Sequence, residues 1–286
     1  MSLPFALHII FVVCNWIPVT LTYSFLLGRG RILNWGPIGI GLFAAYSVFI
    51  TLSMTDSYLI AIVTGIVSVA LISSFYAWLA LRLPGEAFGV LSIAVHLALL
   101  DLVLTWTSFT NGAMGIARIP RLPYMESQEA ITLVAVIVAL LWIAFMLWLD
   151  KSSLARRLSA LGEQESHALS LGISRIRAFL LAFLILGAGF LTESILYTQY
   201  LHLLYPTDSQ FPAFIFLLLI VVAGKPGNMY GTLLATIALV FLREAIRFLP
   251  LAPESIGPMR LILFGFILIG AVYWRRDSLF PVQRSV

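Results

Sequence analysis

Two acidic residues, Asp101 and Glu193, lie within long apolar stretches of the chain. A charge inside a lipid bilayer costs at least ~2.5 kcal/mol, so a membrane helix that carries one usually turns it toward a cavity or a partner. Asp101 is therefore a candidate to line a polar pathway or to contact the amine of a substrate. The alternative is that it forms a hydrogen bond between helices or is protonated. Glu193 is a second pathway candidate, or else an interfacial group, because it lies nearer the expected outer surface.

A short polar segment, "WTSFTNGAMGIARIP", follows the stretch that contains Asp101. Its hydroxyls and backbone amides could hold the carboxylate of a small zwitterion, since helix ends and turns bind anions through N–H groups. An ordinary exposed polar turn is the alternative interpretation. The candidate pathway residues of this segment are Thr107, Thr110, Asn111, Gly112 and Gly115.

The sequence contains no residue pattern typical of catalysis or metal binding. The four histidines are scattered, and no two of them have the spacing of a metal-binding helix. The Gly-Lys pair at 224–225 is followed by Pro226, which excludes the phosphate-binding loop motif. We therefore expect a chain that is not an enzyme and that holds no metal or cofactor. Arg243, Glu244 and Arg247 are interpreted only as an ion-paired helix end.

The composition places the chain in a membrane. Of its 286 residues, 61% are hydrophobic and 10% are charged, whereas soluble domains carry roughly 25% charged residues. The mean hydropathy is +1.02. Several apolar runs reach the ~20 residues that a helix needs to cross a bilayer, and the ~10-residue alternating segments of a membrane β-barrel are not seen. The sequence thus predicts an all-α, polytopic transmembrane helical bundle. The net charge of +4 is attributed to topology and does not indicate nucleic acid.

A single transmembrane domain, residues 1–286, is expected to contain about 8–10 spans, some of them broken. The first span is interpreted as retained, because no signal-peptide features precede it. The seventh is short. The nine apolar segments are 5–27, 36–54, 58–81, 87–107, 129–149, 178–200, 211–224, 229–248 and 259–274.

Lys and Arg residues indicate the orientation, because they are retained on the cytoplasmic side of a membrane. The loops at 55–57 and 201–210 contain none, and Arg118 and Arg121 are exceptions to the pattern. We expect an outside amino terminus, an inside carboxyl terminus and a cytoplasmic segment at 152–174. The basic residues in alternate connections are Arg29, Arg31, Arg82, Lys151, Arg156, Arg157, Arg175, Arg177, Arg275 and Arg276.

The segment 152–174 is too polar to cross a membrane, yet it has a helical pattern. Its apolar residues recur close to one helical face, which predicts a helix at the membrane surface. Gly162 is expected to divide it into two short helices, and Gly172 to end the second. The apolar residues are Leu154, Leu158, Leu161, Ala168 and Leu169.

Two apolar segments begin with Gly and Pro, namely "NWGPIGIGLFAAY" at 34–46 and "GKPGNMYGTLLA" at 224–235. Non-helical backbone at membrane depth is tolerated only beside a cavity or packed protein. Because one lies before the segment 152–174 and the other after it, they are compatible with an internal inverted repeat of broken helices around a central pathway. The alternative is that both are ordinary helix ends.

Three stretches together resemble, in the same order, the permease subunits of branched-chain amino acid type ABC importers, in particular the LivM-like subunit. They are 81–120, 155–191 and 259–281, and they include "TNGAMGIARIP", "ARRLSALGEQESHALSLGISRIRAF" and "MRLILFGFILIGAVYWRRDSLFP". The resemblance implies that the segment 152–174 is a cytoplasmic coupling helix that docks on an ATP-binding subunit. Its candidate coupling residues are Arg157, Glu163, Glu165, His167, Ala168 and Gly172.

Two departures from the family pattern concern expected pathway elements. Lys225 and Pro226 interrupt the glycine pattern of "AGKPGNMYGTLLA", and "NWGPIGIGLFAAY" lacks the histidine that the family has there. Both leave the identity of the solute open.

The resemblance implies a multi-pass permease subunit of a prokaryotic inner membrane, which imports branched-chain or other neutral amino acids. The implied partners are a homologous second permease subunit, two ABC ATPase subunits that bind ATP and Mg²⁺, and an extracytoplasmic solute-binding protein. Urea and short amides are alternative solutes within the family. A stand-alone secondary transporter or channel, with Asp101 as its coupling residue, is the competing class. A membrane-embedded transferase is a more distant alternative.

Overall fold

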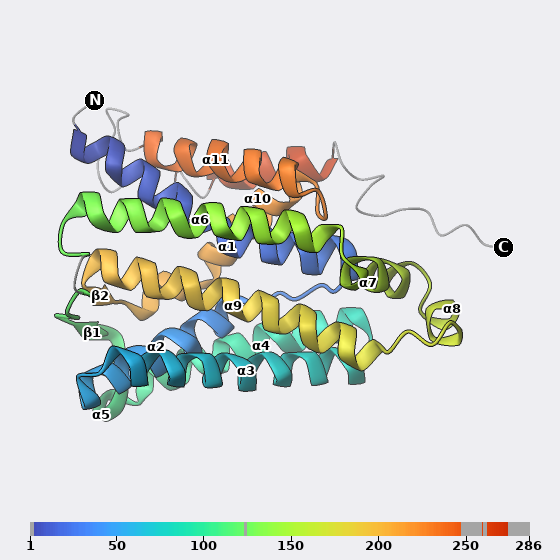
Figure 1. Cartoon of the computed structure of the whole chain (residues 1–286), viewed down its shortest axis with the longest axis horizontal. Helices are drawn as coiled ribbons and strands as arrows, with labels where there is room; N and C mark the ends of the chain where they lie inside the picture. Colours follow the sequence, from blue (N-terminus) through green and yellow to red (C-terminus); the bar gives the residue numbers. More distant parts are fainter. Residues whose placement is uncertain (1–2, 123–124, 247–258, 260–261, 274–286) are drawn as a thin grey trace.

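The computed structural model describes residues 3–122, 125–246, 259 and 262–273. Long helices lie side by side along one axis of the molecule (Figure 1). They are α1 (Leu3–Gly30), α2 (Ile38–Thr55), α3 (Tyr58–Arg82), α4 (Gly85–Thr105), α6 (Gln128–Asp150), α9 (Arg175–Leu201), α10 (Phe211–Gly224) and α11 (Met229–Ala245). The short elements are α5 (Thr107–Thr110), η1 (Gly112–Met114), β1 (Ile116–Ala117), α7 (Ser153–Glu163), α8 (Glu165–Ser170), β2 (Leu203–Leu204) and η2 (Pro206–Ser209).

Each of the nine apolar segments contains a helix, which confirms the predicted polytopic all-α bundle. In the described part of the chain, six helices are long and apolar enough to cross a membrane: α1, α2, α3, α4, α6 and α9. The seventh segment is α10, whose 14 residues rise only about 21 Å against a hydrocarbon core of ~30 Å. The ninth is described over Ile262–Tyr273. Arg247, Arg275 and Arg276 lie outside the described residues.

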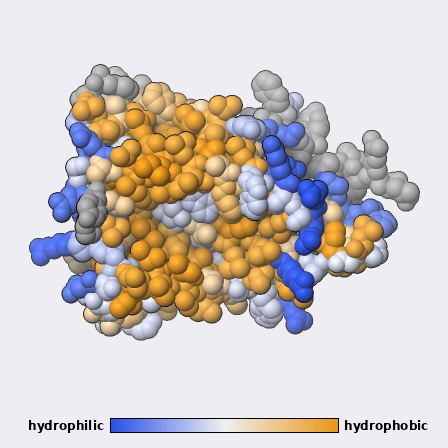
Figure 2. All heavy atoms as spheres, viewed as in Figure 1, coloured by the Kyte–Doolittle hydropathy of each residue, from blue (hydrophilic) through white to orange (hydrophobic). Residues whose placement is uncertain are grey.

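On the face shown in Figure 2, a broad band of hydrophobic side chains covers the middle of the bundle, and hydrophilic side chains gather at its two ends. We call the end with α7 and α8 the inner end, and the end with α5, β1, β2 and η2 the outer end (Figure 1). At the inner end, two hydrogen bonds of 2.8 Å join the Arg29 guanidinium on α1 to the Asp150 carboxylate on α6. The bundle therefore presents apolar side chains to lipid while its helices satisfy their own backbone hydrogen bonds.

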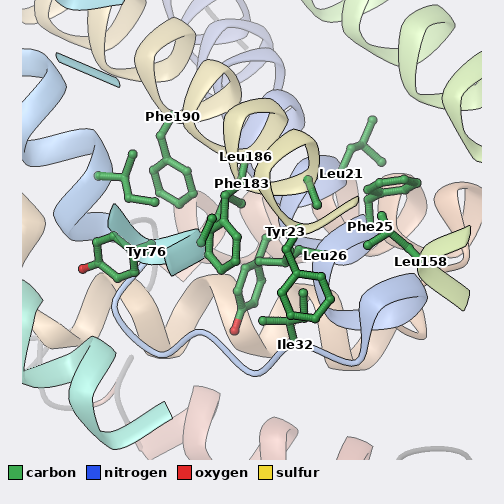
Figure 3. Packing of buried hydrophobic residues seen from close by; sticks show 14 of the residues in the cluster. Leu21, Tyr23, Phe25, Leu26, Ile32, Tyr76, Leu158, Phe183, Leu186 and Phe190 are labelled. Atoms are coloured by element: carbon green, nitrogen blue, oxygen red, sulfur yellow. The ribbon is translucent and has the colours of Figure 1, made fainter. Parts of the chain in front are cut away.

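Helix α1 occupies the centre of the packing and contacts α6, α7, α9, α10 and α11. Its residues Tyr23, Phe25 and Leu26 are fully buried. Figure 3 shows them in one cluster with side chains from α9, among them Phe183, and with Leu158 of α7. Through this cluster α1 joins the short inner-end helices to the spans.

The connection between α1 and α2 runs back into the bundle as extended chain (Figure 1). It comprises residues 31–37, and Asn34 within it is completely buried. Side chains of neighbouring helices complete its hydrogen bonds: the Tyr23 hydroxyl donates to the Asn34 carbonyl at 2.8 Å, and the Tyr76 hydroxyl donates to the Gly36 carbonyl at 3.0 Å. The expected non-helical backbone before α2 is thus present, and it is enclosed by protein rather than lipid.

Tyr23→Phe is expected to destabilise the protein by about 1–3 kcal/mol, because the buried carbonyl of Asn34 loses its donor. Tyr46→Phe is the matched control, since the buried Tyr46 hydroxyl has no hydrogen-bond partner among the described residues. The control should leave the melting temperature unchanged or raise it. Thermal unfolding of the purified variants in detergent measures both effects, and equal melting temperatures would contradict the role of Tyr23.

The turn between α10 and α11, residues 225–228, packs against the inner half of α1. The Gly227 N–H donates to the backbone carbonyl and to the hydroxyl of Ser24, both at 3.1 Å. A Cβ atom on Gly28 would lie 2.0 Å from the Gly227 nitrogen, so this approach of two backbones requires glycine at position 28. The Gly and Pro residues of the second segment therefore form the turn of a helical hairpin that docks on α1.

Two hydroxyl pairs continue this contact along α1 and α11. The Ser24 and Thr232 hydroxyls are 2.8 Å apart, and the Thr236 hydroxyl donates to that of Thr20 at 2.9 Å. All four side chains are completely buried. The hairpin is thus held to α1 by polar contacts within the apolar band, which fix its position along the helix.

Candidate functional site

A cavity of about 180 Å³ lies in the outer half of the bundle, enclosed by α1, α2, α9, α10, α11 and the loop with η2. Its wall combines apolar side chains with ionisable ones. The ionisable residues are Glu193, Tyr197, Tyr205, Asp208 and Arg243. In the part of the chain that the structure describes, no three His, Cys, Asp or Glu side chains are grouped to hold a metal ion.

Glu193 reaches the cavity from α9. The Asn15 side-chain amide donates to its Oε1 at 3.1 Å, and the Ser194 hydroxyl donates to its Oε2 at 3.4 Å. Both donors are neutral, so they orient the carboxylate without cancelling its charge. Glu193 thus lies in a cavity wall, and its role in a pathway stays a prediction.

Arg243 supplies the opposite charge from the end of α11. Its guanidinium carbon lies 4.8 Å from the ring centroid of Phe216 and 5.3 Å from that of Trp16. Its Nε is 3.4 Å from Oε1 of Glu244. Aromatic faces attract a guanidinium and favour a parallel orientation of its plane. The sequence pattern indicates only a helix end here, because the cavity wall is assembled from distant helices.

Asp208 lies on η2 at the exposed edge of the cavity. Desolvation raises the pKa of its carboxyl above the ordinary value, and the positive charge of Arg243 partly opposes that rise. The acidic residues Glu193 and Asp208 and the basic residue Arg243 therefore line the same cavity.

Asp101 does not belong to this cavity. Its side chain is exposed on the outside of α4, and the lining residues come from other elements. The structure thus separates the two carboxylates that the sequence suggests together. Asp101 faces the surroundings of the chain, where lipid or a second subunit would be its neighbour.

The polar segment after α4 forms part of the outer end and is held by the loop after α9. Strands β1 and β2 pair antiparallel, with Ile116 opposite Leu204 and Ala117 opposite Leu203. Gly115 has a φ of +67°, and a Cβ atom there would lie 2.1 Å from the Leu204 carbonyl oxygen. Because Leu203 and Leu204 line the cavity, this segment supports the cavity wall from behind.

Three of the other candidate residues of this segment, Thr110, Asn111 and Gly112, form hydrogen bonds or turns within the loop itself. The buried Thr110 hydroxyl donates to the Val103 carbonyl at 2.6 Å. Asn111 and Gly112 adopt φ values of 61° and 56°, which are typical of a tight turn. Thr107 is exposed. None of the five predicted residues lines the cavity, so their contribution to it is indirect.

At the inner end, the segment 152–174 forms two short helices, as predicted, but they separate at Gln164 and not at Gly162. Gly162 lies within α7, where a Cβ atom would be 3.1 Å from the Gly30 carbonyl oxygen and 3.2 Å from that of Arg29. The glycine therefore permits close packing of α7 against the end of α1.

Gly172 ends α8, as predicted. Its φ is +78°, and its N–H donates to the Leu169 carbonyl at 2.9 Å. The Ile173 N–H donates to the Ala168 carbonyl at 3.1 Å. These two bonds form a Schellman motif, which closes a helix through a left-handed residue.

The apolar stripe of this segment is buried within the chain itself. Ala155, Leu158 and Leu161 of α7 pack into the main core cluster, and Ala168 of α8 is only 2% exposed. The assignment of Ala168 to a docking surface is therefore corrected: its small side chain fits beneath α8 against the bundle and cannot reach a partner.

Three large apolar side chains at the inner end are exposed instead: Leu169, Leu171 and Ile176, by 47%, 79% and 65%. We call them the inner apolar group. Leu169 thus departs from the predicted stripe, because α8 turns away from the axis of α7 after Gln164. Figure 2 shows hydrophobic surface over α8 among the hydrophilic residues of this end.

Charged residues surround the inner apolar group. Arg157, Glu163 and His167 are exposed. Glu165 forms an ion pair of 2.9 Å with Arg175, whose guanidinium also donates to a backbone carbonyl near the end of α3. Glu165 therefore ties α8 to α9 and, through Arg175, to α3.

Sequence patterns do not single out three of these residues, Arg243, Asp208 and Leu171. Arg243 carries the same signal as Glu193, an ionisable group at the end of an apolar stretch. Leu171 is a large apolar residue in a polar segment, off the helical stripe. Asp208 lies in a polar loop and has no distinguishing signal.

Comparisons with a family model and with curated proteins identify the same family of transport permeases. A family model described as branched-chain amino acid transport system / permease component matches residues 5–272. The high-affinity branched-chain amino acid transport system permease protein LivM of Escherichia coli strain K12 is 28% identical over 233 residues, and the protein of that name from Salmonella typhimurium is 27% identical. Each alignment covers 71% of this chain and 53% of the relative, so the chain spans about half the length of these curated relatives. No solved structure matches the chain.

Proposed function

Because the chain belongs to the branched-chain amino acid transport permease family, we propose that it is one of two permease subunits of an ATP-driven amino acid importer. It forms half of the translocation pathway in a prokaryotic inner membrane. Two ATPase subunits dock at the inner end and hydrolyse ATP with Mg²⁺, and an extracytoplasmic binding protein delivers the solute to the outer end. The solutes are branched-chain or other neutral amino acids, as the names of the relatives suggest.

The inner apolar group is the observation that supports this proposal most directly. Leu169 and Leu171 are exposed at the polar end of the bundle, where water surrounds them in the free chain. Burial of apolar surface stabilises a complex by ~25 cal/mol per Å², so this end favours the docking of a short helix into a groove of a soluble partner. The exposed Arg157 and Glu163 supply a polar rim.

The packing of α7 and α8 connects this docking surface to the cavity. Helix α7 contacts α1, α6 and α9, and the Glu165–Arg175 ion pair ties α8 to the start of α9. Helices α1 and α9 carry Asn15 and Glu193 in their outer halves. A push on α8 by the closing ATPases therefore displaces helices that shape the cavity, as alternating access requires.

Purification of the chain from its native host tests the proposal. We expect stoichiometric ATPase subunits to copurify, and ATP to drive leucine uptake by the reconstituted complex. Excess unlabelled leucine should compete with this uptake, whereas urea should not. A chain that purifies alone and accumulates amino acids in liposomes from an ion gradient, without ATP, would instead be a secondary transporter.

A further inference from the structure

Charges of both signs line the cavity in the outer half of the bundle. Glu193 and Asp208 supply two carboxylates, and Arg243 supplies a guanidinium. Ionisable groups inside a membrane protein are costly unless they serve a partner, an ion or a substrate. The rest of the wall is largely apolar and includes Ile38, Leu42, Ala45, Phe190 and Leu217.

We propose that this cavity binds one aliphatic α-amino acid as its zwitterion, within this single chain. The ammonium group lies against Glu193 and Asp208, the carboxylate lies against Arg243, and the side chain lies against the apolar wall. The inference rests on the proposed function and extends it, because it places a solute site inside one subunit and names the groups that recognise each end of the solute.

A zwitterion fits these charges better than a ligand with one charge. A simple amine would leave the guanidinium of Arg243 without a ligand group opposite it. A simple carboxylate would add a third negative charge beside Glu193 and Asp208. Both mismatches are the kind of unfavourable contact by which a site rejects close analogues of its ligand.

The Glu193 carboxylate is oriented before any ligand arrives. Asn15 and Ser194 each donate one hydrogen bond to it, to different oxygens. An ionised carboxylate has about four acceptor positions, so it accepts an ammonium donor in addition. A group that is already in place loses less conformational freedom on binding.

Arg243 is also held in place, by the rings of Trp16 and Phe216 and by Glu244. Glu244 is shared, because Nε2 of His8 lies 3.4 Å from its other oxygen. A guanidinium presents five N–H donors in one plane, and charge-assisted hydrogen bonds from such a group are the kind that recognise a carboxylate.

The cavity has room for such a ligand. Its volume is about 180 Å³, whereas a single water molecule needs ~15 Å³ by the same measure. This space is therefore large enough for a molecule of the size of leucine. The edge near Asp208 is exposed, which provides an entry from the outer end.

Ligand binding to the full chain in lipid nanodiscs, without ATPase subunits, tests the proposal. The probes are L-leucine, isoamylamine, which lacks the carboxylate, and isocaproate, which lacks the ammonium group. Isothermal titration calorimetry reports binding. We expect L-leucine to bind at least about tenfold more tightly than either analogue, because only the zwitterion pairs with both charges.

Two variants assign the two ends of the ligand. Glu193→Gln keeps the shape of the side chain and should weaken L-leucine at least about tenfold without weakening isocaproate. Arg243→Lys keeps the charge but loses the planar fork, and it should weaken L-leucine without weakening isoamylamine. Glu129→Gln, an exposed carboxylate near the outer end of α6 and outside the cavity, is the control and should change nothing. A folding defect would instead reduce the binding of every probe.

Equal affinities for L-leucine and isoamylamine would reveal a cation site and overturn the proposal. The proposal would also be overturned if the Glu193→Gln variant bound leucine as tightly as the wild type, or if the wild type bound no leucine. Copurification of ATPase subunits tests the proposed function independently of the leucine-binding measurement. ATPases without leucine binding would refute only the internal site, whereas leucine binding without ATPases would refute only the importer.

Discussion

Uptake of amino acids by the assembled importer falls at least about 100-fold in the double variant Leu169→Asp, Leu171→Asp. Both side chains are exposed at the inner end, and we place them in the groove of an ATPase subunit. The variant would bury two unpaired carboxylates there, at about 1.5 kcal/mol or more each, and each 1.4 kcal/mol changes an equilibrium tenfold. Uptake of radiolabelled leucine into proteoliposomes, together with ATPase copurification, measures the effect.

Ser153→Asp is the matched control for this prediction. It adds an acidic residue at an exposed position near the start of α7, outside α8 and the inner apolar group. The control should retain ATPase binding and uptake, and all variants should insert into the membrane at the wild-type level. If the double variant still binds ATPases and transports leucine, the inner apolar group is not the docking surface, and another function, such as contact with lipid, applies.

Gly28→Ala is expected to reduce the yield of folded chain at least about tenfold. Overpacking of this kind destabilises the folded state by about 1–3 kcal/mol or more. The new methyl carbon would lie 2.0 Å from the nitrogen of Gly227 and 2.3 Å from the carbonyl carbon of Pro226. Both are backbone atoms, so no side-chain rotation relieves the contact and the whole α10–α11 hairpin must move. Fluorescence-detected size-exclusion chromatography of detergent extracts measures the folded fraction.

Gly85→Ala makes the same chemical change where a Cβ atom meets nothing within 4 Å. It lies at the start of α4, where alanine is a better helix former than glycine, so its yield should equal or exceed that of the wild type. A monodisperse Gly28→Ala protein of wild-type stability would mean that the α10–α11 turn does not dock on α1.

Both predictions concern helix α1 or elements packed against it. At its inner end, Arg29 and Gly30 contact α6 and α7. Farther along, Ser24 and Thr20 hold α11. At the level of the cavity, Asn15 orients Glu193. Helix α1 therefore contacts α7 at the inner end, the α10–α11 hairpin and the cavity wall.

The amino-acid sequence by itself determined the helices and their placement in a membrane. A membrane helix satisfies its backbone hydrogen bonds within its own segment, so the length and polarity of each run are sufficient to locate it. The stop at Gly172 is equally local, because a Schellman motif uses only neighbouring residues. Non-helical chain before α2 was one of two interpretations of its Gly and Pro residues, and the partners that enclose it were not predicted.

The resemblance of three short stretches to a permease family was sufficient to predict the family, since such motifs are contiguous in sequence. The inverted repeat, the outside amino terminus and the partner subunits remain predictions. The family match extends across residues 5–272, well beyond the part of the chain that carries the recognisable motifs.

Only the tertiary structure decided which face of each helix is exposed, which lines the cavity and which packs against another helix. Asp101 and Glu193 have similar sequence surroundings, yet one is exposed on the outside of α4 and the other lines a cavity. Gly162 follows the pattern of a helix break and instead serves the contact with α1. Arg243 joins the cavity through helices that lie far away in sequence. These outcomes depend on contacts between distant segments, which determine the environment of a side chain but leave no trace in local periodicity.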